Sequence, residues 1–239
     1  MSPCLCVLNH FDVPSFYLYK QRIMIKRTIE NTLRHILSPL SLLLCLSLSF
    51  AFVACEEVEE AGVYDNWRAR NEAYIDSIAS LVGNRYVATE EAVMQVPVGE
   101  MFAIRTEAST TEGEQYVYCK KIVDNPTGRR PLYTESVSAY YYGTLITGAS
   151  FDGNFEGYSA IDQQELNATD KVPTDFDSPT TFSISRVVAG WTAALQLMHT
   201  GERWMLYVPY QSGYGTSDNG SISAYSTLVF DLQLEEVVE

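Results

Sequence analysis

Residues 137–152 read VSAYYYGTLITGASFD, and this stretch decides the fold. It overlaps residues 135–146, a segment rich in the tyrosine, valine and isoleucine that are typical of strands. Side chains alternate across a strand, so Val137, Ala139 and Tyr141 would share one face. We therefore expect a strand here, with this face buried.

Other strand patterns flank this segment. Residues 115–124 form one of them and are separated from it by the turn sequence Asn-Pro-Thr-Gly at 125–128. Residues 203–209 and 227–237 form two more, and residues 190–200 carry apolar side chains at helical spacing. Many strands and few helices predict an α+β domain, in which a sheet wraps around one short helix.

The segment over residues 64–112 is predicted to add a helix and short strands. Apolar residues at helical spacing indicate a helix over residues 64–82, capped by Asp65 and ended by Gly83. Residues 86–108 are apolar but interrupted by proline and glycine, which predicts one or two short strands. The helix must bury its apolar face, by default as a lid within the same chain, or alternatively as a homodimer surface.

Residues 1–54 have the order of an export signal, with basic residues first and then an apolar run that ends in small residues before Cys55. Residues 40–54, the apolar run, are fewer than the roughly 20 that a membrane-spanning helix needs. We expect a signal peptide over residues 1–54, with Met24 as an alternative start of the chain. An uncleaved helical anchor is the competing interpretation.

The sequence Val-Ala-Cys that ends at Cys55 resembles the lipobox of bacterial lipoproteins, in which the cysteine is lipidated. Residues 55–63 would then be a lipidated acidic tether. This resemblance implies a location in the cell envelope, with the lipid in the outer membrane and the domain facing the periplasm or the cell surface.

The charge distribution excludes some partners. Residues 1–54 hold five basic and two acidic side chains, which leaves 11 basic and 28 acidic ones in the remainder, a net charge of −17. This acidity argues against binding to nucleic acid. No cysteines or histidines have metal-ligand spacing, and no nucleophile motif or phosphate-binding loop is present, so we expect neither a metal nor a cofactor.

Five sequence blocks, read in order, resemble the FKBP family of peptidyl-prolyl cis/trans isomerases. The blocks are VSAYYYGTL at 137–145, GASFD at 148–152, VVAGW at 187–191 with LQLMHTGE at 195–202, YG at 214–215, and TLVFDLQL at 227–234. The resemblance assigns residues 113–239 to an isomerase domain with an antiparallel twisted sheet. It also implies substrates that contain proline, such as unfolded or exported polypeptides.

The resemblance further implies a hydrophobic pocket floored by Trp191. Asp152 would lie beside the substrate carbonyl, and the hydroxyl of Tyr214 would contact the peptide. The backbone N–H of Ile222 would bind the carbonyl that precedes the proline. The remaining wall residues would be Tyr141, Phe151, Val187, Val188 and Phe230.

The sequence departs from the family at several positions. Thr180 replaces a frequent pocket aromatic, and 29 residues separate Asp152 from Phe182 in what we expect to be a solvated loop that overhangs the pocket. The loop over residues 216–224 is polar. These departures leave two functions open: an isomerase that assists the folding of exported proteins, or a lipid-anchored chaperone or peptide-binding module without significant isomerase activity.

Overall fold

The computed structural model describes residues 22, 24–28, 30–32, 62–108, 113–162 and 166–238. The chain divides into two units, residues 1–61 and residues 62–239. In the first unit the described residues are helical, and the predicted apolar run and Cys55 lie outside them. Among the described residues, no helix is both long and apolar enough to cross a membrane.

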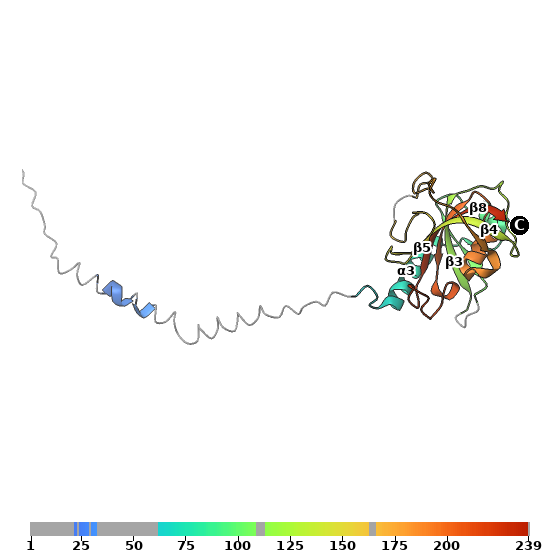
Figure 1. Cartoon of the computed structure of the whole chain (residues 1–239). Coiled ribbons are helices and arrows are strands. Elements are labelled where there is room, and N and C mark those ends of the chain that lie inside the picture. Colours follow the sequence, from blue (N-terminus) through green and yellow to red (C-terminus); the bar gives the residue numbers. More distant parts are fainter. Residues whose placement is uncertain are drawn as a thin grey trace, which may run out of the picture. The chain divides into compact units, whose positions relative to one another are not determined.

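The second unit is an α+β fold built on one large sheet (Figure 1). Its helices among the described residues are α3 (Trp67–Val82), α4 (Glu90–Met94) and α5 (Ala189–Leu195), with 3-10 turns at Ile184–Arg186 and Tyr210–Ser212. Its strands are β1 (Tyr86–Val87), β2 (Met101–Thr106), β3 (Gln115–Val123), β4 (Ser136–Thr144), β5 (Ser150–Gly153), β6 (Thr180–Ser183), β7 (Arg203–Val208) and β8 (Leu228–Val238).

The strands follow the order β1-β2-β3-β7-β8-β4-β5, and β6 pairs with the other end of β4. Only β1 and β2 are parallel among the pairs in the described residues, so the predicted antiparallel sheet is confirmed for the rest. The strand expected at 135–146 is β4, and its residues Tyr141 and Gly143 pair with Leu232 and Phe230 of β8.

The sheet has two covered faces, which we call inner and outer. In β7, Trp204 and Leu206 point to the inner face, where α5 packs, while Met205 and Tyr207 point to the outer face. The predicted helix over residues 190–200 is shorter in the structure, because a turn follows Leu195. The fold therefore buries α5 on one side of the sheet and leaves the other side to be covered by additional segments.

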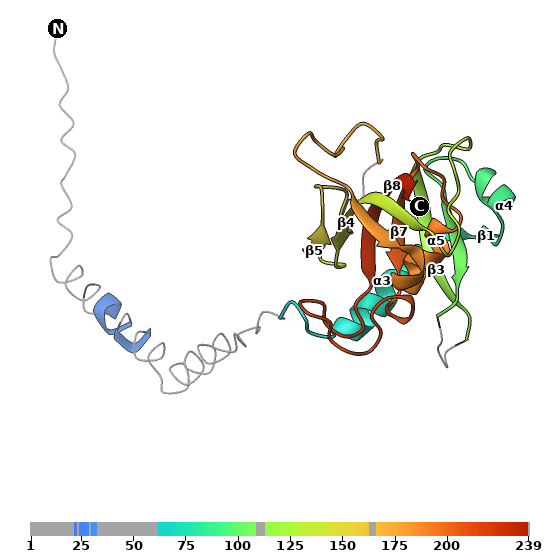
Figure 2. The ribbon, with the colours of Figure 1, turned by 45° about the vertical axis from the view of Figure 1, so that its right-hand side comes forward.

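Helix α3 covers part of the outer face (Figure 2). Its residues Ile78 and Val82 pack against Met101 and Ala103 of β2, which confirms packing within the same chain. Trp67 and Asn71 attach the helix to the segment before β8, since the Trp67 Nε1–H donates to Ser226 Oγ at 2.9 Å and Thr227 N–H donates to Asn71 Oδ1 at 2.7 Å.

The predicted start of this helix was wrong by three residues. The helix begins at Trp67, its N-cap is Asn66, and no side chain caps it. The carboxylate of Asp65 instead accepts a hydrogen bond from the N–H of Gly62 at 2.7 Å. The predicted end is confirmed, because Gly83 adopts φ 61°, which glycine tolerates better than other residues.

The segment over residues 86–108 contains two strands and the short helix α4, which was not predicted. Thr89 caps α4 by accepting a hydrogen bond from the N–H of Ala92 at 3.3 Å. The boundary predicted at residue 113 lies in the connection between β2 and β3, and every residue of β2 pairs with β3. Residues 62–112 therefore contribute strands to the same sheet as the rest of the unit.

The long connection between β5 and β6 lies partly on the outer face, so the prediction of a solvated loop was wrong for this part. Tyr158 and Ala160 are buried against Met205 and Val229, on the face opposite to α5. The buried part of the loop therefore does not overhang the inner face.

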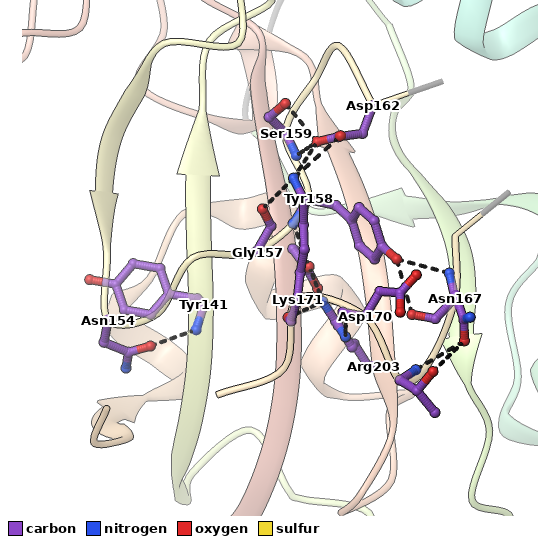
Figure 3. A network of polar contacts seen from close by, with 12 residues as sticks. Tyr141, Asn154, Gly157, Tyr158, Ser159, Asp162, Asn167, Asp170, Lys171 and Arg203 are labelled. Carbon is purple, nitrogen blue, oxygen red and sulfur yellow. Dashed lines mark hydrogen bonds and ion pairs between the residues drawn. The ribbon is translucent and has the colours of Figure 1, made fainter. Parts of the chain in front are cut away.

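A buried ion pair attaches this loop to the sheet. The guanidinium of Arg203 donates two hydrogen bonds to the carboxylate of Asp231, at 2.8 and 2.6 Å, and two more to the carbonyls of Asp170 and Lys171. The same carboxylate accepts the N–H of Tyr158 at 2.8 Å. Figure 3 shows Arg203 beside Asp170, Lys171 and Tyr158. The insertion is therefore held by buried charged groups that are hydrogen-bonded inside the protein.

We expect Arg203→Ala to destabilise the fold by about 3–5 kcal/mol, because it leaves the buried carboxylate of Asp231 without its partner. Urea unfolding followed by circular dichroism measures this change. The matched control is Arg85→Ala, which removes an exposed ion pair with Glu100 and should cost at most about 1 kcal/mol. Equal losses in the two variants would contradict the assignment.

A second buried polar cluster lies at the turn after α5. The carboxylate of Glu202 is 1% exposed and accepts the N–H of His199 at 2.8 Å, and the side chain of His199 in turn contacts Glu90 at 2.9 Å. Burial, with a further contribution from a hydrogen bond to Asp124, raises the pKa of Glu202 to about 7. At Asp124, burial acts to raise the pKa, but hydrogen bonds from Lys121 and Glu202 outweigh burial and lower the pKa below its usual value. The proton shared by this pair therefore stays on Glu202.

This cluster predicts a loss of stability as the pH rises. The folded pKa of Glu202, about 7, exceeds its usual 4.5, so between these pH values the folded chain binds the proton more tightly than the unfolded chain. The free energy of unfolding should fall from pH 5 to pH 8, and Glu202→Gln should reduce that fall by about 1–3 kcal/mol. Thermal unfolding at several pH values measures it, with Glu91→Gln as an exposed control. An unchanged pH dependence in Glu202→Gln would contradict the assignment.

Candidate active site

Trp191 lies at the centre of an aromatic cluster on the inner face. Its indole ring packs edge-on against the rings of Tyr141, Phe182 and Phe230, at centroid distances of 5.5, 5.2 and 5.1 Å. Phe151 extends the cluster, because its ring lies 5.5 Å from that of Phe230 at an angle of 88°. Edge-to-face contacts of this kind are favourable for aromatic rings, so the rings fix one another's orientation.

Two glycines allow these rings to come so close. A Cβ atom on Gly143 of β4 would lie 2.7 Å from the ring of Phe151 and 2.9 Å from that of Phe230. A Cβ atom on Gly190 would lie 2.6 Å from Val208 of β7, so the glycine lets α5 press against the sheet beside Trp191. These contacts explain physically why the two sequence blocks need glycine at these positions.

The structure brings the predicted site residues together, with exposure rising from one end to the other. Trp191 is 4% exposed and Tyr141, Ile222 and Phe230 are also buried, whereas Tyr214 is 44% exposed. Phe151, Val187 and Val188 are half-buried, and Asp152 is exposed. The Asp152 and Tyr214 end of the cluster is therefore open to solvent, and a hollow above the indole stays a prediction.

Tyr141 and Asp152 form a polar pair at the exposed end. Burial, reinforced by a hydrogen bond to the carboxylate of Asp152, raises the pKa of the Tyr141 phenol above its usual value. An electrostatic interaction with Tyr214 contributes in the same direction to the pKa of Tyr141. The phenol therefore stays protonated and orients the carboxylate, which also accepts the N–H of Gly153 at 2.9 Å.

Asn154 fixes the backbone that carries this pair. Its side-chain oxygen accepts the N–H of Tyr141 at 2.9 Å (Figure 3). Its side-chain nitrogen donates to the carbonyl of Ala139 at 3.0 Å. The nitrogen also donates to the hydroxyl of Thr180 at 3.1 Å. Asn154 thus continues the pairing of β4 where β5 ends, a role that no sequence pattern indicated.

The predicted role of the Ile222 N–H conflicts with its hydrogen bonding. This group already donates to the carbonyl of Asn219 at 3.0 Å, in a tight turn that also contains the reverse bond at 2.8 Å. The N–H of Val188, which precedes α5 in an extended conformation, has no acceptor among the described residues. Val188 is therefore the better candidate for binding a substrate carbonyl, because the first N–H groups of a helix lack internal partners.

Residues 128–235 match the family described as FKBP-type peptidyl-prolyl cis-trans isomerase. This region belongs to the FKBP family. It contains the whole aromatic cluster, α5, the Arg203–Asp231 pair and most of β8, whereas β1, β2, β3 and α3 lie before the matched region.

Bacterial proteins are among the relatives that are similar to the FKBP-type region. The outer membrane protein MIP of Legionella longbeachae is 37% identical over 118 residues, which is 49% of this chain and 42% of that protein. A 22 kDa FKBP-type peptidyl-prolyl cis-trans isomerase of Escherichia coli strain K12 is 32% identical over 131 residues, or 54% of this chain and 52% of the relative. The chain thus spans about half the length of these curated relatives.

A solved structure of a peptidyl-prolyl cis-trans isomerase from Pseudomonas syringae pv. tomato was also compared with the chain. It covers 71% of this chain and 96% of its own length, with 24% identity and a TM-score of 0.42.

The aromatic ring that is missing at residue 180 is not replaced at that position, but another aromatic of the same strand joins the cluster. Thr180 is exposed and serves Asn154 as a hydrogen-bond acceptor. Phe182, two residues further along β6, contacts both Tyr141 and Trp191, at 5.3 and 5.2 Å. Phe182 was not among the predicted site residues. Its alternation with Thr180 along a strand offered no signal, because β6 itself was not predicted.

Proposed function

We propose that this protein is a peptidyl-prolyl cis/trans isomerase that acts on unfolded or exported polypeptides. The observation that carries the proposal is the aromatic cluster around Trp191 with the hydrogen-bonded pair of Tyr141 and Asp152 at its exposed end. An apolar surface next to an oriented carboxylate suits a reaction in which no covalent bond breaks.

The reaction is rotation about the amide bond before proline. Resonance opposes this rotation with a barrier of about 18–20 kcal/mol, and the uncatalysed exchange takes tens of seconds or longer. The planar amide is more polar than the twisted one, because resonance places negative charge on its oxygen. Apolar rings that exclude water therefore favour the twisted amide, and each 1.36 kcal/mol of such preference raises the rate roughly tenfold.

The polar groups at the exposed end would act on the peptide in different ways. The carboxylate of Asp152, beside the rotating carbonyl, disfavours the negative charge that resonance places on that oxygen. The free N–H of Val188 holds a second carbonyl of the peptide, and the hydroxyl of Tyr214 can donate to a third group. Val187, Phe151 and Phe230 would contact the proline ring.

Asp152→Ala should lower kcat/KM by about tenfold or more, because it removes both the carboxylate and the acceptor of the Tyr141 hydroxyl. A protease-coupled assay on a short proline peptide, with the full chain in detergent, measures this. Glu156→Ala is the control, since Glu156 is exposed on the same connection and touches none of the site residues described above. Equal kcat/KM values for the two variants, both well folded, would refute the site.

A peptide-binding module without significant isomerase activity is the second candidate. Two observations favour it: Trp191 is only 4% exposed, and Thr180 presents a hydroxyl where an aromatic ring was expected. The same assay separates the candidates, because a binding module would bind the proline peptide without accelerating its isomerisation.

We infer that the protein resides in the cell envelope, held to the outer membrane by a lipid on Cys55. The support is the basic, apolar and small-residue order that ends at Cys55, together with the relative named as an outer membrane protein. A homodimer through residues 64–82 would have to use side chains other than Ile78 and Val82, which are engaged within the chain.

Intact-mass analysis of membrane-purified protein should find a chain that begins at Cys55 and carries the additional mass of acyl groups. Cys55→Ser should release the protein into the soluble fraction or leave its signal uncleaved. Cys45→Ser is the control, since this cysteine lies inside the apolar run of the predicted signal. An unmodified chain that starts at Met1 or Met24 would overturn the lipid anchor.

A further inference from the structure

A groove of about 710 Å³ lies beside the candidate active site, between α5 and the β1–β2 edge of the sheet. One wall is formed by Val87, Ala88 and Ile104, and the other by Ala189, Thr192 and Ala193 of α5. Tyr133, which is 52% exposed, lines it as well. Its size is within the range of ligand-binding clefts, roughly 300–1,000 Å³.

The groove is continuous with the active site through one residue. Val187 is half-buried, packs against the core that contains Trp191, and also lines the groove. Trp191 points from α5 into the aromatic cluster, while Thr192 and Ala193, the next two residues, line the groove. A chain that occupies both places therefore passes over Val187 and Val188.

Free main-chain groups occur on both sides of this groove. Val188 lies between the groove residues Val187 and Ala189 and is extended, with a ψ value of 150°, and its N–H has no acceptor in the part of the chain that the structure describes. On the opposite wall the exposed Ala88 follows the edge strand β1, and its N–H donates no hydrogen bond to a described residue. Such groups pair with the backbone of an extended peptide.

The charges in the groove do not suit an anionic ligand. Arg130 is paired with Glu90 at 2.8 Å and donates to the carbonyl of Gln196, also at 2.8 Å. Arg105 lies 3.4 Å from Glu114, and a further carboxylate, Glu107, lines the groove. Each guanidinium is thus already balanced by a carboxylate, which favours a largely uncharged, hydrogen-bonding occupant.

We propose that this groove binds the polypeptide that flanks the substrate proline, so that the protein prefers unfolded protein chains to short peptides. This proposal rests on the proposed isomerase function and extends it. The groove would hold several residues of the substrate in an extended conformation, on the far side of Val187 from the proline. A tetrapeptide is too short to reach it once its proline is bound.

Two variants of the full chain test the groove. Ala193→Arg places a long side chain inside it with little cost to the helix, because arginine is a good helix former. Tyr133→Ala removes an exposed part of its lining without disturbing the core. Tyr86→Ala is the matched control, since Tyr86 is also 52% exposed and does not line the groove.

Isomerisation is measured on a proline tetrapeptide and on reduced, carboxymethylated ribonuclease T1, whose refolding is limited by proline isomerisation. We expect kcat/KM for the protein substrate to fall about tenfold in Ala193→Arg and about threefold in Tyr133→Ala, with kcat/KM for the tetrapeptide unchanged. Tyr86→Ala should match the wild type on both substrates. Unchanged turnover of the protein substrate in both groove variants would overturn the groove while leaving the isomerase intact.

Binding provides a readout that does not depend on catalysis. The dissociation constant for reduced, carboxymethylated α-lactalbumin, which stays unfolded, is measured by fluorescence titration for the same variants. Weaker binding by about five- to tenfold in Ala193→Arg supports the groove even if the wild type isomerises neither substrate, a result that would remove only the proposed enzyme activity. Wild-type binding in both groove variants would refute the groove.

Discussion

The contact between α5 and the inner face of the sheet is the constraint on which the rest of the structure depends. Gly190 lets the helix approach β7 closely enough for its Cα to face Val208, and Trp191 then enters the space between β4, β6 and β8. The rings of Tyr141, Phe182 and Phe230 fix the indole from three sides. Because interiors are close-packed, one added carbon atom at Gly143 would displace the rings of Phe151 and Phe230, and one at Gly190 would push α5 away from Val208.

The outer face of the sheet is covered by different segments from the inner face. A sheet of this size exposes two apolar faces, and α5 can cover only one of them. Here α3 and the connection between β5 and β6 cover the other, one through Ile78 and Val82 and the other through Tyr158 and Ala160. The buried pair of Arg203 and Asp231 binds main-chain groups of that connection, so the part of the insertion around Tyr158 and Ala160 joins the core on the face opposite to the candidate site.

The sequence was most informative where the local spacing of apolar residues decides which side chains are buried. The alternation of Val137, Ala139 and Tyr141, the Gly-Trp pair and the apolar strands at the C-terminus predicted β4, α5, β7 and β8, since periodicity alone determines which face is buried. Predictions failed where a long-range partner decides. The burial of Tyr158 depends on Asp231, 73 residues away, and the N–H of Ile222 donates to Asn219 in a turn that no local sequence pattern indicates.

The arrangement of β8 has a consequence for how this chain acquires its structure. This strand, at residues 228–238, is the last along the described part of the chain, yet it lies between β7 and β4 and separates the two halves of the sheet. Its partner β4 is some ninety residues earlier, and pairing over such distances is slow because the intervening chain must first lose its freedom. The sheet cannot close until residue 238 has left the ribosome. If the chain is exported as proposed, this delay keeps the polypeptide unfolded until its synthesis is complete, as passage through a secretion channel requires.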